Sequence, residues 1–168
     1  MKRAEQRNRV QPIAMGEFLT EYRPGSPDDY LLAAEMRQEM AIELEGDWDA
    51  EHPGWRQRFA DYFARRQAAG RAQLFMAVES ETPIGMAIVS IADHYRAETQ
   101  GISFGYVNGV YVKPMWRRRG IGRHLMDLAI RWARGRGCAT LRLRSSDEGR
   151  ALYEALGFRP SSEMQLRL

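Results

Sequence analysis

The sequence predicts an α+β domain in which helices flank one mixed, mostly antiparallel sheet. Three observations support this fold class: two amphipathic helix patterns come first, three strand-like apolar runs follow, and strand and helix patterns then alternate. With 168 residues, 44% of them hydrophobic and 28% charged, the chain has the composition of one soluble globular domain. Residues 17–168 are predicted to form it, after a basic arm at residues 1–16 that we expect to be flexible.

The first predicted elements are a short strand at residues 17–23 and a helix that begins near Ser26. Ser26 can cap this helix, Pro27 suits its first position, and Asp29 stands where a capping box has its acid. Apolar side chains then recur every four residues and form one buried helix face: Leu32, Met36 and Met40.

A second helix is predicted at residues 53–69, because large aromatic side chains recur there at helical spacing: Trp55, Phe59, Tyr62 and Phe63. Strand-like runs follow at 73–78, 84–94 and 104–112, and the polar turn at 79–83 makes the first two a hairpin. The remaining pattern predicts a helix at 121–136, a strand at 139–144, a short helix at 148–156 and a last strand after Phe158.

Charge and cysteine content narrow the functional classes. Arginines cluster between residues 117 and 144, whereas residues 28–51 are acidic, so we expect an anion to bind the second half of the chain. The single cysteine, Cys138, is compatible with a reducing cytoplasm, which is the expected location. No apolar run reaches the roughly 18 to 20 residues that span a bilayer. We predict no metal site, because the histidines lack ligand spacing.

The segment WRRRGIGRHL, residues 116–125, is the strongest local signal for a ligand. It follows a strand that Lys113 and Pro114 end, and it runs into a helix pattern, so it forms a strand-to-helix loop and a first helical turn. The first N–H groups of a helix lack intrahelical partners, and Gly120 and Gly122 let a bulky anion approach them. The segment therefore predicts a phosphate cradle, to which the arginines add charge-assisted hydrogen bonds.

Two familiar phosphate loops do not fit this segment. A dinucleotide fingerprint needs a glycine or alanine where this chain has Leu125. A Walker A loop needs Lys-Ser or Lys-Thr after a glycine, and neither pair follows a glycine here. Binding of nucleic-acid phosphates by the clustered arginines stays open as an alternative.

Two signatures in the second half of the chain carry a resemblance to a known family. Arg117-Arg118-Arg119-Gly120-Ile121-Gly122 matches the pattern (Q/R)-x-x-G-x-(G/A), and it follows the strand end Val110-Tyr111-Val112-Lys113-Pro114. Ala151-Leu152-Tyr153-Glu154-Ala155-Leu156-Gly157-Phe158 is similar to the pattern LYexLGF. In both, the chain resembles the GNAT superfamily, the acetyl-CoA-dependent N-acetyltransferases. The resemblance covers roughly residues 18–168 and implies the GNAT fold, with a splayed central strand pair.

The resemblance implies an acyltransferase that moves an acetyl group from acetyl-CoA to a primary amine by direct nucleophilic attack. Tyr153 falls on the tyrosine proposed to protonate the leaving thiolate, and a phenol with a pKa of about 10 can donate to a thiolate with a pKa of about 8.5. Gly109 would mark the bulge that splays its strand from the one at 139–144. The residues implied to bind the cofactor are Val110, Tyr111, Val112, Arg117, Arg118, Arg119, Gly120, Ile121, Gly122, Arg123 and Ser146.

The chain departs from the family pattern at two positions. Ser146 stands where many members have an asparagine that contacts the pantetheine arm, and its hydroxyl can make that contact or pass it to Ser145. Asn108 stands where several members have a glutamate that acts as base or substrate anchor. The general base therefore stays open, with His94, Tyr106 or an acid of the first helices, acting through water, as candidates.

The expected partner is an amine of a small molecule or a peptide, with no nucleic acid and no membrane. Glu43, in an acidic helical row that otherwise forms a solvated face, is a candidate contact for a cationic acceptor, as are Trp48 and Asn108. Two other classes stay open: a non-catalytic CoA-binding regulatory module, favoured by the asparagine, and a nucleic-acid-binding protein. The sequence leaves the choice between monomer and homodimer open.

Overall fold

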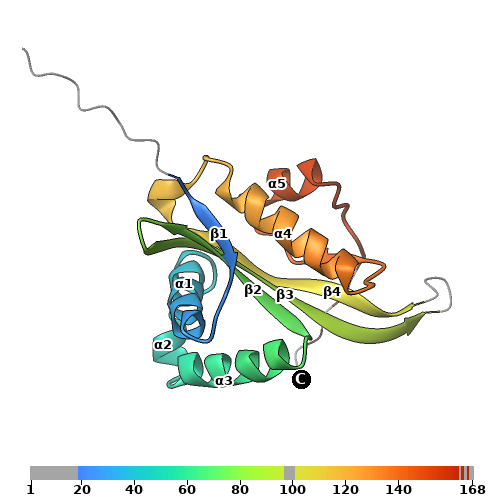
Figure 1. Cartoon of the computed structure of the whole chain (residues 1–168), viewed down its shortest axis with the longest axis horizontal. Coiled ribbons are helices and arrows are strands. Elements are labelled where there is room, and N and C mark those ends of the chain that lie inside the picture. The colour runs from blue at the N-terminus through green and yellow to red at the C-terminus, as the bar shows by residue number, and fades with distance from the viewer. Residues whose placement is uncertain (1–18, 97–100, 163, 165, 167–168) are drawn as a thin grey trace, which may run out of the picture.

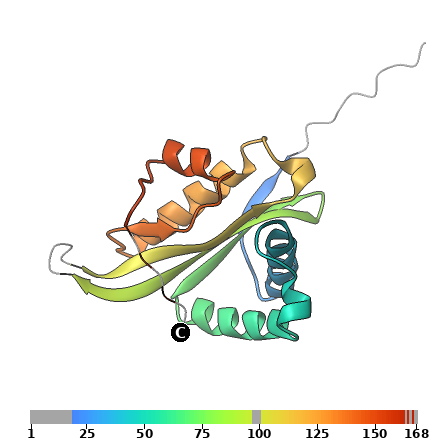
Figure 2. The same ribbon diagram turned by 180° about the vertical axis from the view of Figure 1, so that it is seen from behind.

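The computed structural model describes residues 19–96, 101–162, 164 and 166, and the predicted arm at residues 1–16 lies outside them. A central sheet separates two helical layers: α1 (Asp29–Leu44), α2 (Trp48–Glu51) and α3 (Trp55–Ala68) cover one face, and α4 (Ile121–Gly135) and α5 (Arg150–Ala155) lie over the other (Figures 1 and 2). The sheet has five strands in the order β1-β2-β3-β4-β5. Their bounds are Glu21–Pro24, Ala72–Glu79, Thr82–Arg96, Gly101–Val112 and Leu141–Leu143.

The sheet is mixed and mostly antiparallel, as predicted: only β4 and β5 pair in parallel. The sequence of strand β2 is almost continuously apolar because both faces of the strand are buried. Leu74 and Met76 pack against α1 and α3, whereas Phe75 and Ala77 pack against α4. Successive side chains of a strand point to opposite faces, and both faces of this sheet are covered by helices.

The central strand pair is splayed, as the resemblance implied. Strand β5 pairs with β4 only from Gly105 to Val107, while β4 continues to Val112. The register between β3 and β4 shifts at this point: Val107 pairs with Val89, Gly109 pairs with Ile88, and Asn108 is the extra residue between them. This bulge, beside the predicted Gly109, bends β4 where the two strands part.

The start of α1 confirms the capping-box acid but not the serine cap. The Asp29 carboxylate accepts hydrogen bonds from the Ser26 N–H at 2.7 Å and from the Ser26 hydroxyl at 2.9 Å, so the serine donates its side chain instead of capping with it. Arg23 of β1 adds two bonds to the same carboxylate, at 2.6 and 2.9 Å. The hydrogen bond from Arg23 is the main cause that lowers the pKa of Asp29 to about 2.

Asp29→Asn is expected to lower the free energy of unfolding by about 2 kcal/mol near neutral pH, because the buried carboxylate loses its charge-assisted bonds. A lowered pKa stabilises the fold above the ordinary carboxyl pKa, and this contribution is lost as the pH falls from about 4 towards 2. Urea unfolding of both proteins across that window checks this, with the exposed neighbour Asp28→Asn as the control. A difference that does not shrink on acidification would contradict the ionic explanation.

Two features of the fold were not predicted correctly. The described residues after Phe158 form no strand, so the last predicted strand is wrong for that part of the chain. The short helix α2 was missed, although Asp47 caps it by accepting bonds from the N–H groups of Asp49 and Ala50. The other predicted helices and strands are present, with boundaries that differ by a few residues.

Candidate functional site

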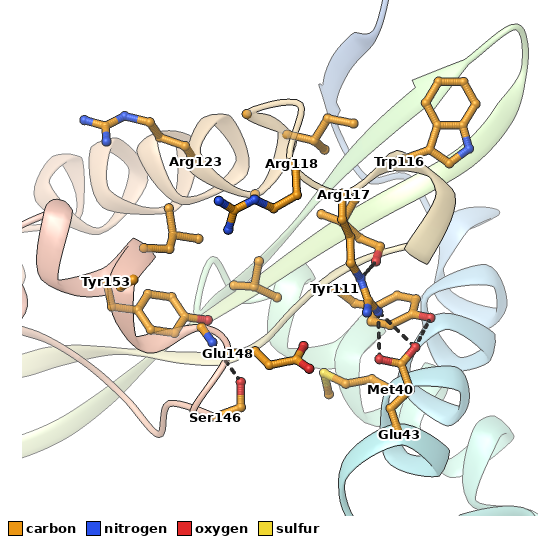
Figure 3. A pocket seen from close by; sticks show the side chains of 18 of the residues that line it. Met40, Glu43, Tyr111, Trp116, Arg117, Arg118, Arg123, Ser146, Glu148 and Tyr153 are labelled. Atoms are coloured by element: carbon orange, nitrogen blue, oxygen red, sulfur yellow. Dashed lines mark hydrogen bonds and ion pairs between the residues drawn. The ribbon is translucent and has the colours of Figure 1, made fainter.

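A cavity of about 530 Å³ lies beside β4, beyond the point where β5 ends (Figure 3). Its walls come from the end of α1, the last residues of β4, the loop and first turn of α4, and the segment that leads into α5. The residues predicted from the sequence that line it are Glu43, Val110, Tyr111, Val112, Arg117, Arg118, Gly120, Ile121, Gly122, Arg123, Ser146 and Tyr153. The fold thus brings the two sequence signatures to one cavity.

The edge of β4 that faces the cavity carries backbone groups that have no partner strand among the described residues. The Lys113 N–H donates to the Ile84 carbonyl at 2.9 Å. Because bonded and non-bonded pairs alternate along an antiparallel ladder, Tyr111 bonds towards β3, and Val110 and Val112 turn their N–H and C=O groups to the opposite edge. Among the described residues, no strand pairs with that edge beyond Val107. An extended chain could therefore bind there as an added strand.

The loop before α4 forms a concave set of backbone N–H groups. Arg118 and Gly120 have left-handed backbone angles, with φ of 63° and 81°. The first helical bond of α4 runs from the His124 N–H to the Gly120 carbonyl at 3.0 Å. The N–H groups of the preceding helical residues consequently have no intrahelical acceptor, and the positive end of the helix dipole lies with them. This geometry is that of an anion-binding nest.

The arginines of this loop point in different directions. Arg118 extends into the cavity, while the Arg123 guanidinium points away from Tyr153 (Figure 3). The Arg119 guanidinium lies 4.8 Å from the centre of the Trp116 ring, and this residue is outside the cavity lining. Its cofactor role, like those of the other predicted site residues, stays a prediction. Charge at the cradle therefore comes mainly from Arg118 and the backbone.

Arg117 joins the cradle to α1 instead of pointing at the nest. Its Nε donates to the Val112 carbonyl at 2.8 Å, and one terminal nitrogen contacts both Glu43 oxygens at 2.9 and 2.7 Å. The Tyr111 hydroxyl donates to the same carboxylate at 3.0 Å. Burial, followed by the hydrogen bond and charge of Glu43, raises the pKa of Tyr111, so this phenol keeps its proton. Glu43 therefore lines the cavity, but its negative charge is already paired with Arg117, and its contact with a cationic acceptor stays a prediction.

Tyr153 projects from α5 into the cavity (Figure 3). Its ring lies edge-on to Phe158, with the ring centres 6.0 Å apart. It also lies so close to Gly149 that a Cβ at that position would come within 2.9 Å of the tyrosine Cε2, so only glycine leaves room for the ring. Burial raises the pKa of the Tyr153 hydroxyl, which favours a proton donor at neutral pH.

Ser146 shapes the same wall of the cavity. Its hydroxyl oxygen accepts a hydrogen bond from the Gly149 N–H at 3.2 Å, which is a local turn contact. The hydroxyl proton is still available to a ligand, because accepting a bond leaves the donor function of a hydroxyl unused. Its predicted contact with pantetheine thus remains compatible with the geometry.

The remaining predicted contacts lie outside the cavity lining. Asn108 occupies the bulge, where its side-chain oxygen accepts from the Ser90 hydroxyl at 2.7 Å. Trp48 packs edge-on against Trp55 in the helical layer. Of the candidate bases, Tyr106 does not line the cavity, and the side chain of His94 lies outside the described residues.

Two charged residues near the site, Arg37 and Glu148, were not predicted from the sequence. Arg37 of α1 donates to the Asn108 carbonyl at 3.1 Å, and its guanidinium lies over the rings of Trp48 and Phe59 at 5.4 and 5.3 Å. It thereby holds the bulge from the α1 side. Glu148 lines the cavity, although the sequence indicated only that it starts a helix. Neither residue belongs to a pattern that could have singled it out.

The described residues hold no group of three or more histidine, cysteine, aspartate or glutamate side chains placed to bind a metal ion. Within the same residues, no helix combines the length and the apolar character needed to cross a membrane.

The chain is similar in sequence to a known protein family. A family model described as "Acetyltransferase (GNAT) family" matches residues 34–158. The aminoglycoside N(6')-acetyltransferase type 1 of Stenotrophomonas maltophilia is 34% identical over 94 residues, which cover 54% of this chain and 61% of that protein. The match thus spans less than two thirds of that relative.

Solved structures share the fold. A GCN5-related N-acetyltransferase from Ralstonia eutropha JMP134 superposes with a TM-score of 0.79 at 27% identity, covering 89% of this chain and 98% of that one. A predicted acetyltransferase with acetyl-CoA from Clostridium acetobutylicum also gives a TM-score of 0.79, at 23% identity over 89% of this chain and 96% of that one. With its two signatures on one cavity and the family model matching most of its length, the chain belongs to the GNAT acetyltransferase family.

Proposed function

We propose that this protein is an N-acetyltransferase that moves an acetyl group from acetyl-CoA to a primary amine by direct attack. The observation that carries the proposal is the single cavity in which an anion nest, an open strand edge and a protonated tyrosine meet. Family membership supports acetyl-CoA as the co-substrate. The acceptor is an amine of a small molecule or peptide, and the place of action is the cytoplasm.

The cavity residues fit the parts of acetyl-CoA. The nest at Gly120, Ile121 and Gly122 suits the pyrophosphate, with Arg118 adding a charge-assisted bond. The N–H and C=O groups of Val110 and the N–H of Val112 face the open strand edge and suit the amide groups of the pantetheine arm, which would lie along β4 as an added strand. The Val112 carbonyl is already bonded to Arg117. The thioester would then lie near the bulge, where a backbone N–H can polarise its carbonyl. Tyr153 is placed to protonate the sulfur as it leaves.

The alternatives explain fewer of these features. A nucleic-acid-binding protein would use the loop arginines as a basic surface, but Arg117 is bound to Glu43 and Arg119 stacks on Trp116. A regulatory CoA-binding module would need the nest and the strand edge, yet it gives no reason for a phenol directed into the cavity. Acetyl-CoA should raise the melting temperature of the protein, whereas duplex DNA at equal concentration should not. The reverse result would reject the acetyltransferase.

Gly120→Ala tests the nest without filling it. A Cβ at Gly120 meets no atom within 4 Å, so the substitution acts only through its φ of 81°. The left-handed angle should cost alanine about 1 to 2 kcal/mol of stability and should weaken the stabilisation by acetyl-CoA. Gly135→Ala is the matched control, because it also has open space, lies in the last turn of the same helix, and has no positive φ. Thermal melting with and without acetyl-CoA measures both effects, and equal behaviour of the two variants would rule out the nest.

A further inference from the structure

The cavity contains a carboxylate, that of Glu148, which has no role in the acetyl transfer as described above. Glu148 precedes α5, and its side chain extends into the space between Tyr153 and Met40 (Figure 3). Within the described part of the chain, no hydrogen bond or ion pair engages this carboxylate. Glu148 is exposed to solvent and lines the cavity, so an incoming ligand can reach it.

The other groups that could take a proton in the cavity are occupied. Glu43 is the second carboxylate of the lining, and both its oxygens are bound by Arg117 and Tyr111. A proton placed on Glu43 would therefore disrupt an ion pair. The hydroxyls of Tyr111 and Tyr153 keep their protons, since burial raises both pKa values. Asn108, at the position where several family members have an acid, cannot accept a proton near neutral pH.

Charged and titratable groups surround Glu148 on several elements. Those lining the same cavity are Glu43 of α1, Tyr111 of β4, Arg117 and Arg118 of the loop, Arg123 of α4 and Tyr153 of α5. Burial works against the charged form of Arg117, yet the bond to Glu43 and the charges of Glu43, Tyr111 and Glu148 hold its pKa above the ordinary value. The charge of Glu148 therefore acts at the end of the cavity where α1 meets the cradle.

We propose that Glu148 is the general base that receives the acceptor ammonium and takes its proton, an inference that rests on the acetyl transfer proposed above. The ammonium donates a hydrogen bond to the Glu148 carboxylate and passes one proton to it. The nitrogen lone pair then forms the C–N bond with the thioester carbonyl carbon.

The remaining steps release CoA and return each protein group to its starting protonation state. The C–S bond breaks with its electron pair going to sulfur, and Tyr153 protonates the thiolate. The nitrogen loses its second proton as the amide forms, and that proton restores the Tyr153 hydroxyl. Glu148 returns its own proton to solvent. Acetyl-CoA and an ammonium thus give an acetamide, free CoA and one proton.

The test is Glu148→Gln, which removes the proton-accepting function but keeps the shape of the side chain. CoA release is followed with kanamycin, spermidine and lysine as primary-amine probes. The variant should lose about 100-fold or more in kcat near neutral pH, as expected for loss of a general base, with an unchanged dissociation constant for acetyl-CoA. The loss should shrink as the pH approaches the pKa of the probe ammonium, about 10 for lysine, because solvent then supplies the neutral amine. Asp147→Asn is the control: it makes the same charge change on an exposed neighbour outside the cavity lining.

Each result has a distinct meaning. Equal kcat for Glu148→Gln and wild type would overturn the base role alone. A raised KM for the amine, with unchanged kcat and an unchanged pH profile, would make Glu148 an anchor and also overturn it. If the wild type binds acetyl-CoA but none of the amines causes it to release CoA, that result would overturn the proposed function itself, and the base role with it.

Discussion

Tyr153→Phe is expected to lower kcat about 100-fold or more while leaving the dissociation constant for acetyl-CoA within about twofold. The ring of phenylalanine keeps the edge-on contact with Phe158 and the close packing on Gly149, so the wall of the cavity is preserved. Only the hydroxyl is lost, and with it the proton donor for the leaving thiolate. Without that donor the sulfur must leave as an anion inside a partly buried cavity, which raises the barrier.

The pH profile gives this prediction a second readout. Burial raises the pKa of Tyr153, so the wild-type phenol stays protonated to a pH above the ordinary phenol value. The kcat of the wild type should therefore decline only in strongly alkaline solution, and the phenylalanine variant should lack that decline. Tyr62→Phe, which removes an exposed hydroxyl from α3, is the matched control. Equal losses in kcat and acetyl-CoA affinity would show that Tyr153 contributes to packing of the cavity wall but does not donate a proton to the thiolate.

Gly122→Leu is expected to raise the dissociation constant for acetyl-CoA about 100-fold, which corresponds to losing about 3 kcal/mol of hydrogen bonds between the nest and the pyrophosphate. Gly122 lines the cavity at the second residue of α4. Its Cβ would lie 3.4 Å from Leu152 and 3.8 Å from Val112, and both of these residues line the cavity. We therefore expect the larger side chain of leucine to occupy the part of the cavity beside the nest.

This substitution separates blocked binding from damage to the fold. Gly122 has no positive φ, and a larger residue suits a helix better than glycine does, so the variant should not be less stable. Gly122→Ala is the control, because a single methyl group makes ordinary contacts there and should leave binding intact. Calorimetric titration with acetyl-CoA measures both. Unchanged affinity in the leucine variant would mean that the pyrophosphate binds elsewhere.

Local patterns in the sequence were enough to predict most of the fold. The capping-box acid Asp29 acts through Ser26, three residues away, and an isolated strand glycine, Gly109, marks the bulge beside it. The apolar run of β2 follows from burial of both sheet faces. The helix α2 was missed because four residues are too few to show a helical period. The last strand was predicted after Phe158, and the described residues there form no strand.

The parts of the site that are formed by backbone groups could be predicted from the sequence. Positive φ at Gly120 and the free N–H groups of α4 follow from the loop itself. The direction of Arg117 does not, because its partner Glu43 lies 74 residues away in the sequence and reaches it only through the packing of α1. Glu148 was overlooked for the same reason: its place in the cavity depends on how α5 and its leading segment lie over the sheet.

The most direct test of the account is amine-dependent release of CoA by the wild-type protein. Acetyl-CoA is supplied at saturation, the free thiol is followed over time, and the amine is examined by mass spectrometry. We predict that thiol release requires both the protein and a primary amine, and that the amine gains one acetyl group for each CoA released. Tight binding of acetyl-CoA, with no thiol release above the protein-free rate for any amine, would contradict the account and favour a regulatory module.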